Sequence, residues 1–232
     1  MWGDIALILG AYLLGSLPCL SALGKARGIA LEGDGHISLW QKGGQLIGLI
    51  GLLGEFIRGA IPILVGKSLG FNLFIITLAG LAVVSGQMWP LFSRFDGEKG
   101  NSTGLAVAAA LAPKPLLIAL VPIAIGAAIR TVPRLLDAGE SLNERLKLGA
   151  PPSRSLPLGI AIGFFLLPIA SWRLKEPLVI TSGCFALFVL IMVRRLTAGL
   201  RGDLELNTDV KDIVANRLLY DRSRFDRKEG KE

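Results

Sequence analysis

Apolar segments long enough to cross a lipid bilayer constrain the fold of this chain more than any other feature. A transmembrane helix needs about 20 apolar residues, within a range of about 17 to 25. The segments at about 4–23, 45–66 and 71–93 each reach this length, and further apolar segments lie at about 103–112, 115–130, 156–172 and 177–193. The pattern predicts an all-α, polytopic integral membrane protein with about seven transmembrane helices.

The composition supports the same class of protein. Hydrophobic residues make up 52% of the 232 residues, and the mean hydropathy is +0.58. The net charge of +7 comes mainly from basic residues between the apolar segments and in the tail, where anionic lipid headgroups would meet them. This distribution favours a membrane surface over nucleic acid as the partner. Cys19 and Cys184 both lie within apolar segments, which favours helix packing over a disulfide or a metal site.

The apolar region at 103–130 is too long for one untilted span. Ala112-Pro113-Lys114-Pro115 interrupts it, so we expect two short helices that meet at this turn. One long helix kinked at the prolines is the alternative. The first apolar segment has Asp4 where a signal peptide would carry basic residues, and it lacks a clear cleavage site, so we expect it to remain in the mature protein.

The distribution of Lys and Arg predicts the orientation. With the N-terminus outside, the inside gaps hold most of these residues, namely Lys25, Arg27, Lys42, Arg94, Lys99, Arg130, Arg134, Arg145, Lys147 and Arg154. We therefore expect a transmembrane domain at 1–200, with a cytoplasmic loop insertion near 131–155, and a charged cytoplasmic tail at 201–232. The tail fits a solvated amphipathic helix or a disordered segment, and a basic lipid-facing strip is a further option.

A glycine-rich passage at 86–104 lies between two apolar segments. It sets Lys99 after Gly97-Glu98 and before Gly100, with Ser102 and Thr103 close behind. Glycines let backbone N–H groups approach an anion closely, and the N-terminus of a following helix adds partial positive charge. The passage therefore predicts a phosphate site at the membrane surface. The alternative is that Lys99 only anchors a helix end.

Three elements along the chain carry a resemblance to a known family. They are Gly15-Ser16-Leu17-Pro18, Glu55-Phe56-Ile57-Arg58-Gly59, and the passage from Trp89-Pro90 to Gly97-Glu98-Lys99-Gly100 and Thr103. With Arg195-Leu196-Thr197-Ala198-Gly199 near the end, the chain resembles the bacterial acyl-phosphate:glycerol-3-phosphate acyltransferases over nearly its whole length. These are integral membrane enzymes that acylate glycerol 3-phosphate.

The chain also departs from the family pattern. In the first inside loop Asp34 stands at a Ser position, and His36 and Gln41 stand at Asn positions. Gln87 replaces a His in the glycine-rich passage. Val189 and Met192 stand where the family has a His and an Asn.

The resemblance implies transfer of an acyl group from acyl phosphate to glycerol 3-phosphate, giving lysophosphatidate and phosphate, in the cell membrane and without a metal or other cofactor. It implies Lys99 as a catalytic residue. The phosphate-binding residues would be Gly33, Gly35, Lys42, Arg58, Gly97, Gly100, Thr103 and Arg195. His36 or Asp34 is the candidate base, because a glycerol hydroxyl must lose its proton as it attacks.

Other interpretations remain open at this stage. Glu55 and Arg58 are spaced i, i+3 and share a helix face, so they fit a purely structural ion pair as well as a site. Asp34 between two glycines fits a structural turn. The whole protein fits a catalytically degenerate relative that binds lipid phosphates or acts as a scaffold, or, with less support, a small transporter.

Overall fold

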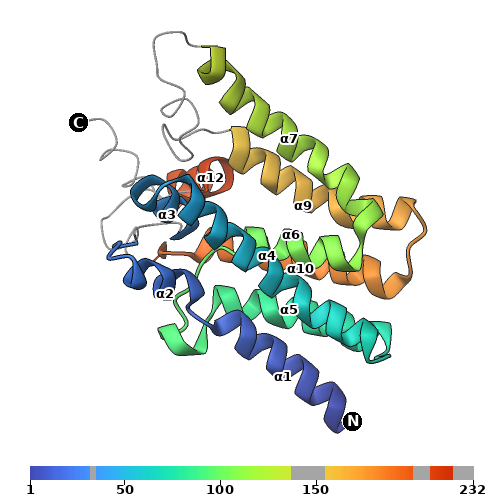
Figure 1. The fold of residues 1–232 in the computed structure, drawn as a ribbon. Coiled ribbons are helices and arrows are strands. Elements are labelled where there is room, and N and C mark those ends of the chain that lie inside the picture. The colour runs from blue at the N-terminus through green and yellow to red at the C-terminus, as the bar shows by residue number, and fades with distance from the viewer. Residues whose placement is uncertain (32–34, 137–154, 201–209, 222–232) are drawn as a thin grey trace.

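The computed structural model describes residues 1–31, 35–136, 155–200 and 210–221. Within these ranges the chain is built from helices joined by turns, which confirms the predicted all-α class (Figure 1). The elements are α1 (Trp2–Ser16), α2 (Cys19–Ala26), α3 (Gly35–Gly43), α4 (Gln45–Ser68), α5 (Leu73–Met88), η1 (Leu91–Ser93), α6 (Asn101–Leu111), α7 (Pro113–Leu136), α9 (Ser155–Arg173), α10 (Leu178–Thr197) and α12 (Val210–Tyr220).

Within the described ranges, six helical segments are long and apolar enough to cross a membrane. They are Trp2–Ala26, Gln45–Ser68, Leu73–Ser93, Pro113–Pro133, Ser155–Arg173 and Leu178–Thr197. The membrane-spanning class is therefore confirmed. The difference from the predicted seven lies at α6, which is apolar but has only 11 residues, fewer than a full span needs. The orientation of the two ends stays a prediction.

The predicted break in the 103–130 region is present. Helix α6 ends at Leu111, Ala112 adopts φ −136° and ψ 64°, and α7 begins at Pro113. A proline disfavours helical geometry at the residue before it, which explains the position of the break. The second helix is longer than expected, because α7 continues to Leu136 and takes up the start of the predicted 131–155 loop. The rest of that loop, 137–154, lies outside the described residues.

The long helices pack in pairs. Helix α1 lies beside α5, α7 beside α9 and α4 beside α6, while α10 contacts both α5 and α9 (Figure 1). Their shared core is apolar and includes fully buried side chains such as Val83, Met88, Val107, Phe164 and Ile191. The short helices α2, α3 and α12 gather at one end of the bundle. This arrangement brings the polar connections between the long helices together at that end.

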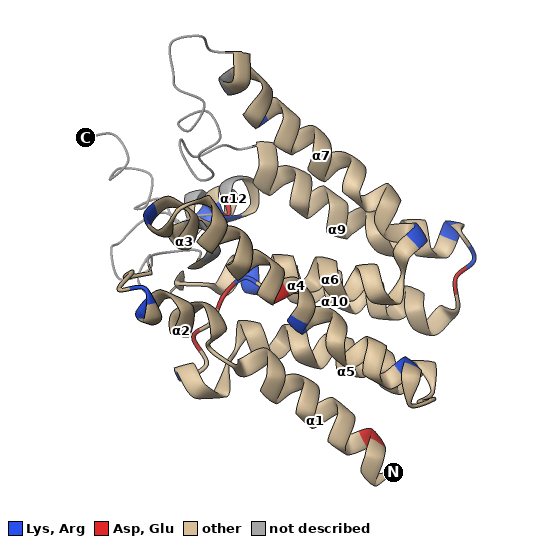
Figure 2. Ribbon diagram, viewed as in Figure 1, with Lys and Arg blue, Asp and Glu red and all other residues tan. Residues whose placement is uncertain are grey.

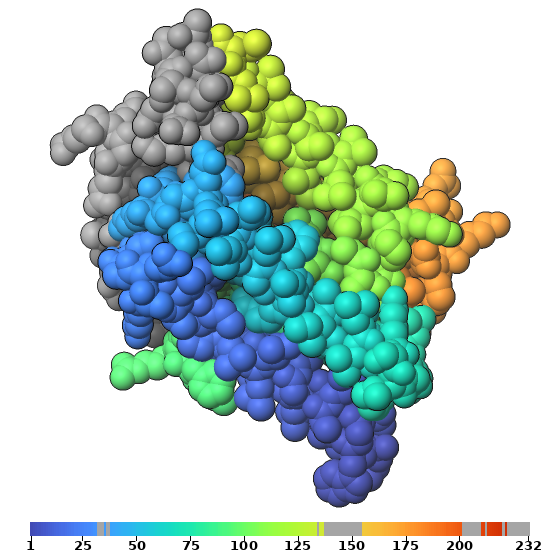
Figure 3. Space-filling view, in the orientation of Figure 1, coloured from blue at the N-terminus to red at the C-terminus, as the bar shows by residue number. Residues whose placement is uncertain are grey.

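The outer surface of the bundle is strongly apolar. Ile57 is 60% exposed, Leu64 56% and Val121 54%. A soluble monomer rarely exposes so large an apolar surface to water, whereas in a membrane the lipid tails would cover this surface. Lys, Arg, Asp and Glu gather at the two ends of the helices, with a few beside the middle of α4 (Figure 2). The space-filling view shows a hollow between α4 and α7, with α9 deeper behind it (Figure 3).

Helices α1 and α5 approach each other through glycines. A Cβ added at Gly15 would press on the carbonyl of Val83, and one added at Gly86 would press on the carbonyl of Tyr12, in both cases closer than 3.0 Å. Small residues at a helix interface let two backbones approach, which is how helices associate in lipid. The contact fixes the end of α1 beside the end of α5.

Part of the predicted tail is a packed helix. Helix α12 contacts α9 and α10, and its Ile213 and Arg217 are buried at 1% and 3% exposure. A helix is present at 210–220, as one of the expectations for the tail had it, but this helix packs against the bundle and is not fully solvated. Residues 201–209 and 222–232 lie outside the described residues.

Candidate functional site

A cavity of about 260 Å³ lies where α1 gives way to α2, at the end of the bundle that holds α3. Its walls also come from α4, from the end of α5 and from the loop that follows η1. The lining residues are Gly15 to Ser21, Leu31, Gly35, Arg58, Gln87, Pro90, Ser93 and Asp96 to Glu98. Charged and polar side chains are thus collected beside transmembrane helices, which is typical of a functional site in a membrane protein.

The break between α1 and α2 opens one wall of the cavity. Pro18 forces the preceding Leu17 out of helical geometry, to φ −64° and ψ 129°, so α1 ends at Ser16. The carbonyl of Leu17 accepts a hydrogen bond of 2.9 Å from the N–H of Cys19 and one of 2.8 Å from Nη1 of Arg58 on α4. The Gly-Ser-Leu-Pro sequence therefore positions the arginine of a distant helix.

Glu55 lies behind the cavity at the centre of a buried polar network. Its side chain is 1% exposed, and its Oε1 accepts a hydrogen bond of 2.5 Å from Nε2 of Gln87. Ser102 donates to its Oε2, and Nη2 of Arg58 lies 3.7 Å from its Oε1. The i, i+3 ion pair expected from the sequence is thus present. It supports the polar side chains that face the cavity.

Two buried polar atoms on the cavity wall have no hydrogen-bond partner within the described part of the chain. They are Nε of Arg58, whose side chain is 7% exposed, and Oε1 of Gln87, whose residue is 4% exposed. A buried polar group left unsatisfied costs about 1–3 kcal/mol. A polar ligand or water in the cavity would remove this cost, and the wall is therefore suited to holding a polar group.

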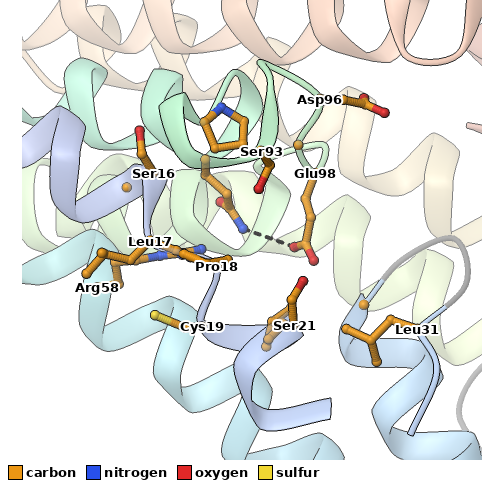
Figure 4. A pocket seen from close by; sticks show the side chains of 16 residues that line it. Ser16, Leu17, Pro18, Cys19, Ser21, Leu31, Arg58, Ser93, Asp96 and Glu98 are labelled. Atoms are coloured by element: carbon orange, nitrogen blue, oxygen red, sulfur yellow. Dashed lines mark hydrogen bonds between the residues drawn. The ribbon is translucent and has the colours of Figure 1, made fainter. Parts of the chain in front are cut away.

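The loop after η1 forms the opposite wall and is held by Arg194 of α10. Nη2 of Arg194 contacts Oδ1 of Asp96 at 3.1 Å and donates to the carbonyl of Gly97, while its Nε donates to the carbonyl of Glu98 at 3.3 Å. A side chain at Gly97 would collide with the carbonyl of Gln87, so only glycine fits there. The loop is fixed, and the Glu98 side chain reaches Gln87, as the dashed line in Figure 4 shows.

The rest of the glycine-rich passage starts α6. Gly100 has a left-handed backbone, φ +76°, and caps the helix that begins at Asn101. A helix following this passage was expected from the sequence. Thr103 is fully buried, and its Oγ1 lies 3.5 Å from the carbonyl of Glu55. Neither Gly100 nor Thr103 lines the cavity.

Two of the predicted phosphate-binding cations meet the end of α12 instead of the cavity. Nζ of Lys99 lies 2.7 Å from the carbonyl oxygen and 3.3 Å from Oδ2 of Asp221. Nε of Arg195 lies 3.7 Å from Oδ1 of the same Asp221 and donates to the carbonyl of Arg217 at 2.9 Å. The negative end of the α12 dipole adds to this attraction. Lys99 and Arg195 thus dock α12 on the bundle.

We expect Asp221→Asn to loosen α12. The change removes a carboxylate from Lys99 and from Arg195, which is 3% exposed, and a buried partner lost in this way costs about 1–3 kcal/mol. Hydrogen exchange of the amides at 210–220 should rise about tenfold or more, because local opening sets their exchange. Asp4→Asn, at an exposed terminal ion pair, is the matched control. Unchanged exchange in the Asp221 variant would contradict this account of docking.

The first inside loop contributes in part. Gly35 lines the cavity at the start of α3, whereas Lys42 is exposed and donates to the carbonyl of Ala30 at 3.1 Å. Gly33 and Asp34 lie outside the described residues. For His36 the structure describes the backbone position in α3 and not the side chain.

Sequence reasoning gave no site role to three residues that shape this cavity. Gln87 and Glu98 line it, and Arg194 holds its loop. Gln87 and Glu98 stood within the glycine-rich passage, so their place in the sequence was the available signal. For Arg194 the sequence offered no signal other than its position next to Arg195. Among the described residues, no group of three or more His, Cys, Asp or Glu side chains could hold a metal ion.

Fold and cavity together define the class: an all-helical integral membrane protein with a polar cavity near one end of its helices. The sequence pattern described as glycerol-3-phosphate acyltransferase matches residues 5–200. The chain belongs to the glycerol-3-phosphate acyltransferase family.

Individual relatives agree with this assignment. A glycerol-3-phosphate acyltransferase of Geobacter metallireducens is 40% identical over 120 residues, which cover 50% of this chain and only 62% of the relative. Glycerol-3-phosphate acyltransferase 4 of Dehalococcoides mccartyi is 32% identical over 227 residues, covering 94% of this chain and 88% of the relative. The crystal structure of PlsY (YgiH) in its lysophosphatidic acid form shares the fold, with a TM-score of 0.67, 22% identity and coverage of 89% of this chain and 94% of PlsY.

Proposed function

We propose that this protein transfers an acyl group from an acyl phosphate to glycerol 3-phosphate at the cell membrane, forming lysophosphatidate and releasing phosphate. One observation carries the proposal. The Gly-Ser-Leu-Pro element at 15–18, Arg58 of α4 and the loop at Gly97 carry the family resemblance from distant parts of the chain, and they line one cavity. The solved structures of PlsY include a glycerol 3-phosphate form and a lysophosphatidic acid form, which for that protein name a substrate and a product of this chemistry.

The reaction needs little beyond positioning and charge neutralisation. The hydroxyl oxygen of glycerol 3-phosphate attacks the acyl carbonyl carbon, a new C–O bond forms, and the bond from that carbon to the phosphate oxygen breaks. Phosphate leaves with the electron pair, and it is already a good leaving group. Positioned cations and N–H groups stabilise the negative charge that develops on the carbonyl oxygen. No covalent nucleophile is required.

The residues fall into roles within this proposal. Arg58, whose buried Nε makes no hydrogen bond to any described residue, binds a phosphate group in the cavity, with backbone N–H groups of the loop at Gly97 and of Gly35 nearby. Lys99 comes directly after the lining residue Glu98 in the sequence and adds positive electrostatic potential near the cavity. Arg195 helps to hold Lys99 in place, because both side chains contact Asp221. Lys42, Gly33, Gly100 and Thr103 complete the set implied by the resemblance. His36 and Asp34 are the candidates for the base that the first loop offers.

Phosphate release measured with and without the acceptor tests the proposal. The purified protein in lipid should release phosphate from a long-chain acyl phosphate only when glycerol 3-phosphate is added. Lys99→Ala should lower this rate about tenfold or more, because a positive charge next to the site and an anchor of its loop are lost together. Lys114→Ala, an exposed lysine at the start of α7, should release phosphate at the wild-type rate. Release that does not depend on glycerol 3-phosphate would contradict the proposal.

A further inference from the structure

Glu98 brings a carboxylate to the wall of the cavity. Asp96 also borders the cavity, but its side chain is 89% exposed and pairs with Arg194. Figure 4 shows the difference, since Asp96 points away while the carboxylate of Glu98 points into the space above Ser21. Among the described residues that line the cavity, Glu98 is therefore the acid directed into it.

The position of Glu98 is fixed on several sides. Its N–H donates to the carbonyl of Gln87 at 3.2 Å, and its carbonyl accepts from Arg194 at 3.3 Å. Its Oε2 accepts a hydrogen bond of 3.2 Å from Nε2 of Gln87. A Cβ at Gly35 would come within 2.6 Å of its Oε1, so the carboxylate rests against the backbone at the start of α3. A group held in this way is preorganised for a reaction.

A carboxylate is costly in a cavity that binds phosphate groups. Two like charges in direct contact repel strongly, even at the effective dielectric constant near a protein surface. The cavity can hold a phosphate group despite this repulsion because the two charged groups lie on different sides, the guanidinium of Arg58 on one side and the carboxylate of Glu98 on the other (Figure 4). A ligand with a phosphate at one end and hydroxyl groups at the other matches both sides. The hydroxyl end is the part that can donate a hydrogen bond to a carboxylate.

We infer that Glu98 accepts the proton of the attacking hydroxyl group of glycerol 3-phosphate; this inference rests on the proposed function. As the hydroxyl oxygen bonds to the acyl carbon, its O–H bond breaks and the proton passes to the Glu98 carboxylate. The bond between the acyl carbon and the phosphate oxygen breaks, and its electron pair leaves with the phosphate. Glu98 returns to its carboxylate form by giving the proton to the departing phosphate or to water.

Glu98→Gln tests this role, because it keeps the shape of the side chain and removes its ability to accept a proton. General-base catalysis contributes about 10²–10⁴-fold to a rate, so kcat should fall by about that factor. KM for glycerol 3-phosphate should change less than about tenfold, since a base acts mainly in the transition state. In the wild type, kcat/KM should fall as the pH drops and the base becomes protonated, and this acid limb should disappear in the variant. Glu98→Asp should restore part of kcat.

The controls separate this inference from the proposed function. Glu176→Gln makes the same change in the turn between α9 and α10, at the other end of the bundle, and should behave as wild type. An active wild type together with a Glu98→Gln variant that keeps its rate and its acid limb would overturn the role of Glu98 alone. So would loss of the acid limb in His36→Ala or Asp34→Ala with the limb retained in Glu98→Gln. A folded wild type with no acyl transfer would overturn the proposed function as well.

Discussion

Arg58→Gln should lower the kcat/KM of acyl transfer by about 10²–10³-fold, which is the usual cost of removing one positioned donor that stabilises developing charge. Among the described residues, Arg58 is the basic side chain that lines the cavity, and its Nη1 is oriented by the carbonyl of Leu17. Glutamine keeps a polar group but removes the positive charge. Initial rates over a range of glycerol 3-phosphate concentrations measure the effect.

Two controls show whether the loss is chemical or structural. Lys67→Gln changes a basic residue on the same helix, outside the cavity, and should leave the rate unchanged. Loss of Arg58 alone leaves Glu55 buried without its basic partner, which costs about 3–5 kcal/mol when a buried pair is broken. The Glu55→Gln/Arg58→Gln double variant removes both charges and should recover stability but not activity. A double variant within about threefold of the wild-type rate would show that Arg58 has no role in the reaction.

Gly86→Ala should destabilise the protein by about 3 kcal/mol or more, at the upper end of what overpacking costs, because the new methyl group meets backbone and no side chain can move aside. Its Cβ would press on the carbonyl of Tyr12 and lie 3.0 Å from the N of Ser16. Helices α1 and α5 would have to separate, which also displaces the wall at Ser16 to Pro18. Thermal unfolding in detergent and the yield of monodisperse protein measure the effect.

Gly54→Ala and Gly10→Ala are matched controls for this prediction. A Cβ at either position would meet no other described part of the chain within 4 Å, and both glycines lie inside helices, where alanine is favoured over glycine by about 1 kcal/mol. We expect both variants to be at least as stable as wild type. A Gly86→Ala protein that unfolds at the same temperature as these controls would show that the close contact of α1 with α5 is not needed.

Much of the fold could be predicted from the sequence because a membrane helix is recognisable from the length and hydropathy of its own segment. Length and hydropathy were sufficient to find the long helices, and the prolines at 113 and 115 were sufficient to place the break between α6 and α7. The i, i+3 spacing of Glu55 and Arg58 predicted their pairing, since neighbours on one helix face meet whatever the tertiary structure. The segment at 103–112 was counted among the seven spans, although its helix α6 has only 11 residues, because hydropathy alone does not show whether a short apolar helix crosses the bilayer.

The site was harder to predict because it depends on contacts between distant residues. Lys99 and Asp221 are 122 positions apart, and no local pattern shows that the end of α12 would pair with this lysine. Arg194 and Arg195 are neighbours in sequence but face different partners, the loop at Gly97 and the helix α12. Successive residues on a helix point about 100° apart, so adjacency gave no guide to their roles.

The formation of lysophosphatidate tests the central claim most directly. Isotope-labelled glycerol 3-phosphate and a long-chain acyl phosphate would be incubated with the wild-type protein in lipid vesicles, and the products would be identified by mass spectrometry. We expect labelled lysophosphatidate in an amount equal to the phosphate released. A folded protein that forms none with acyl phosphates of several chain lengths would contradict the assignment of acyl transfer to this cavity, and would favour a relative that binds lipid phosphates without catalysis.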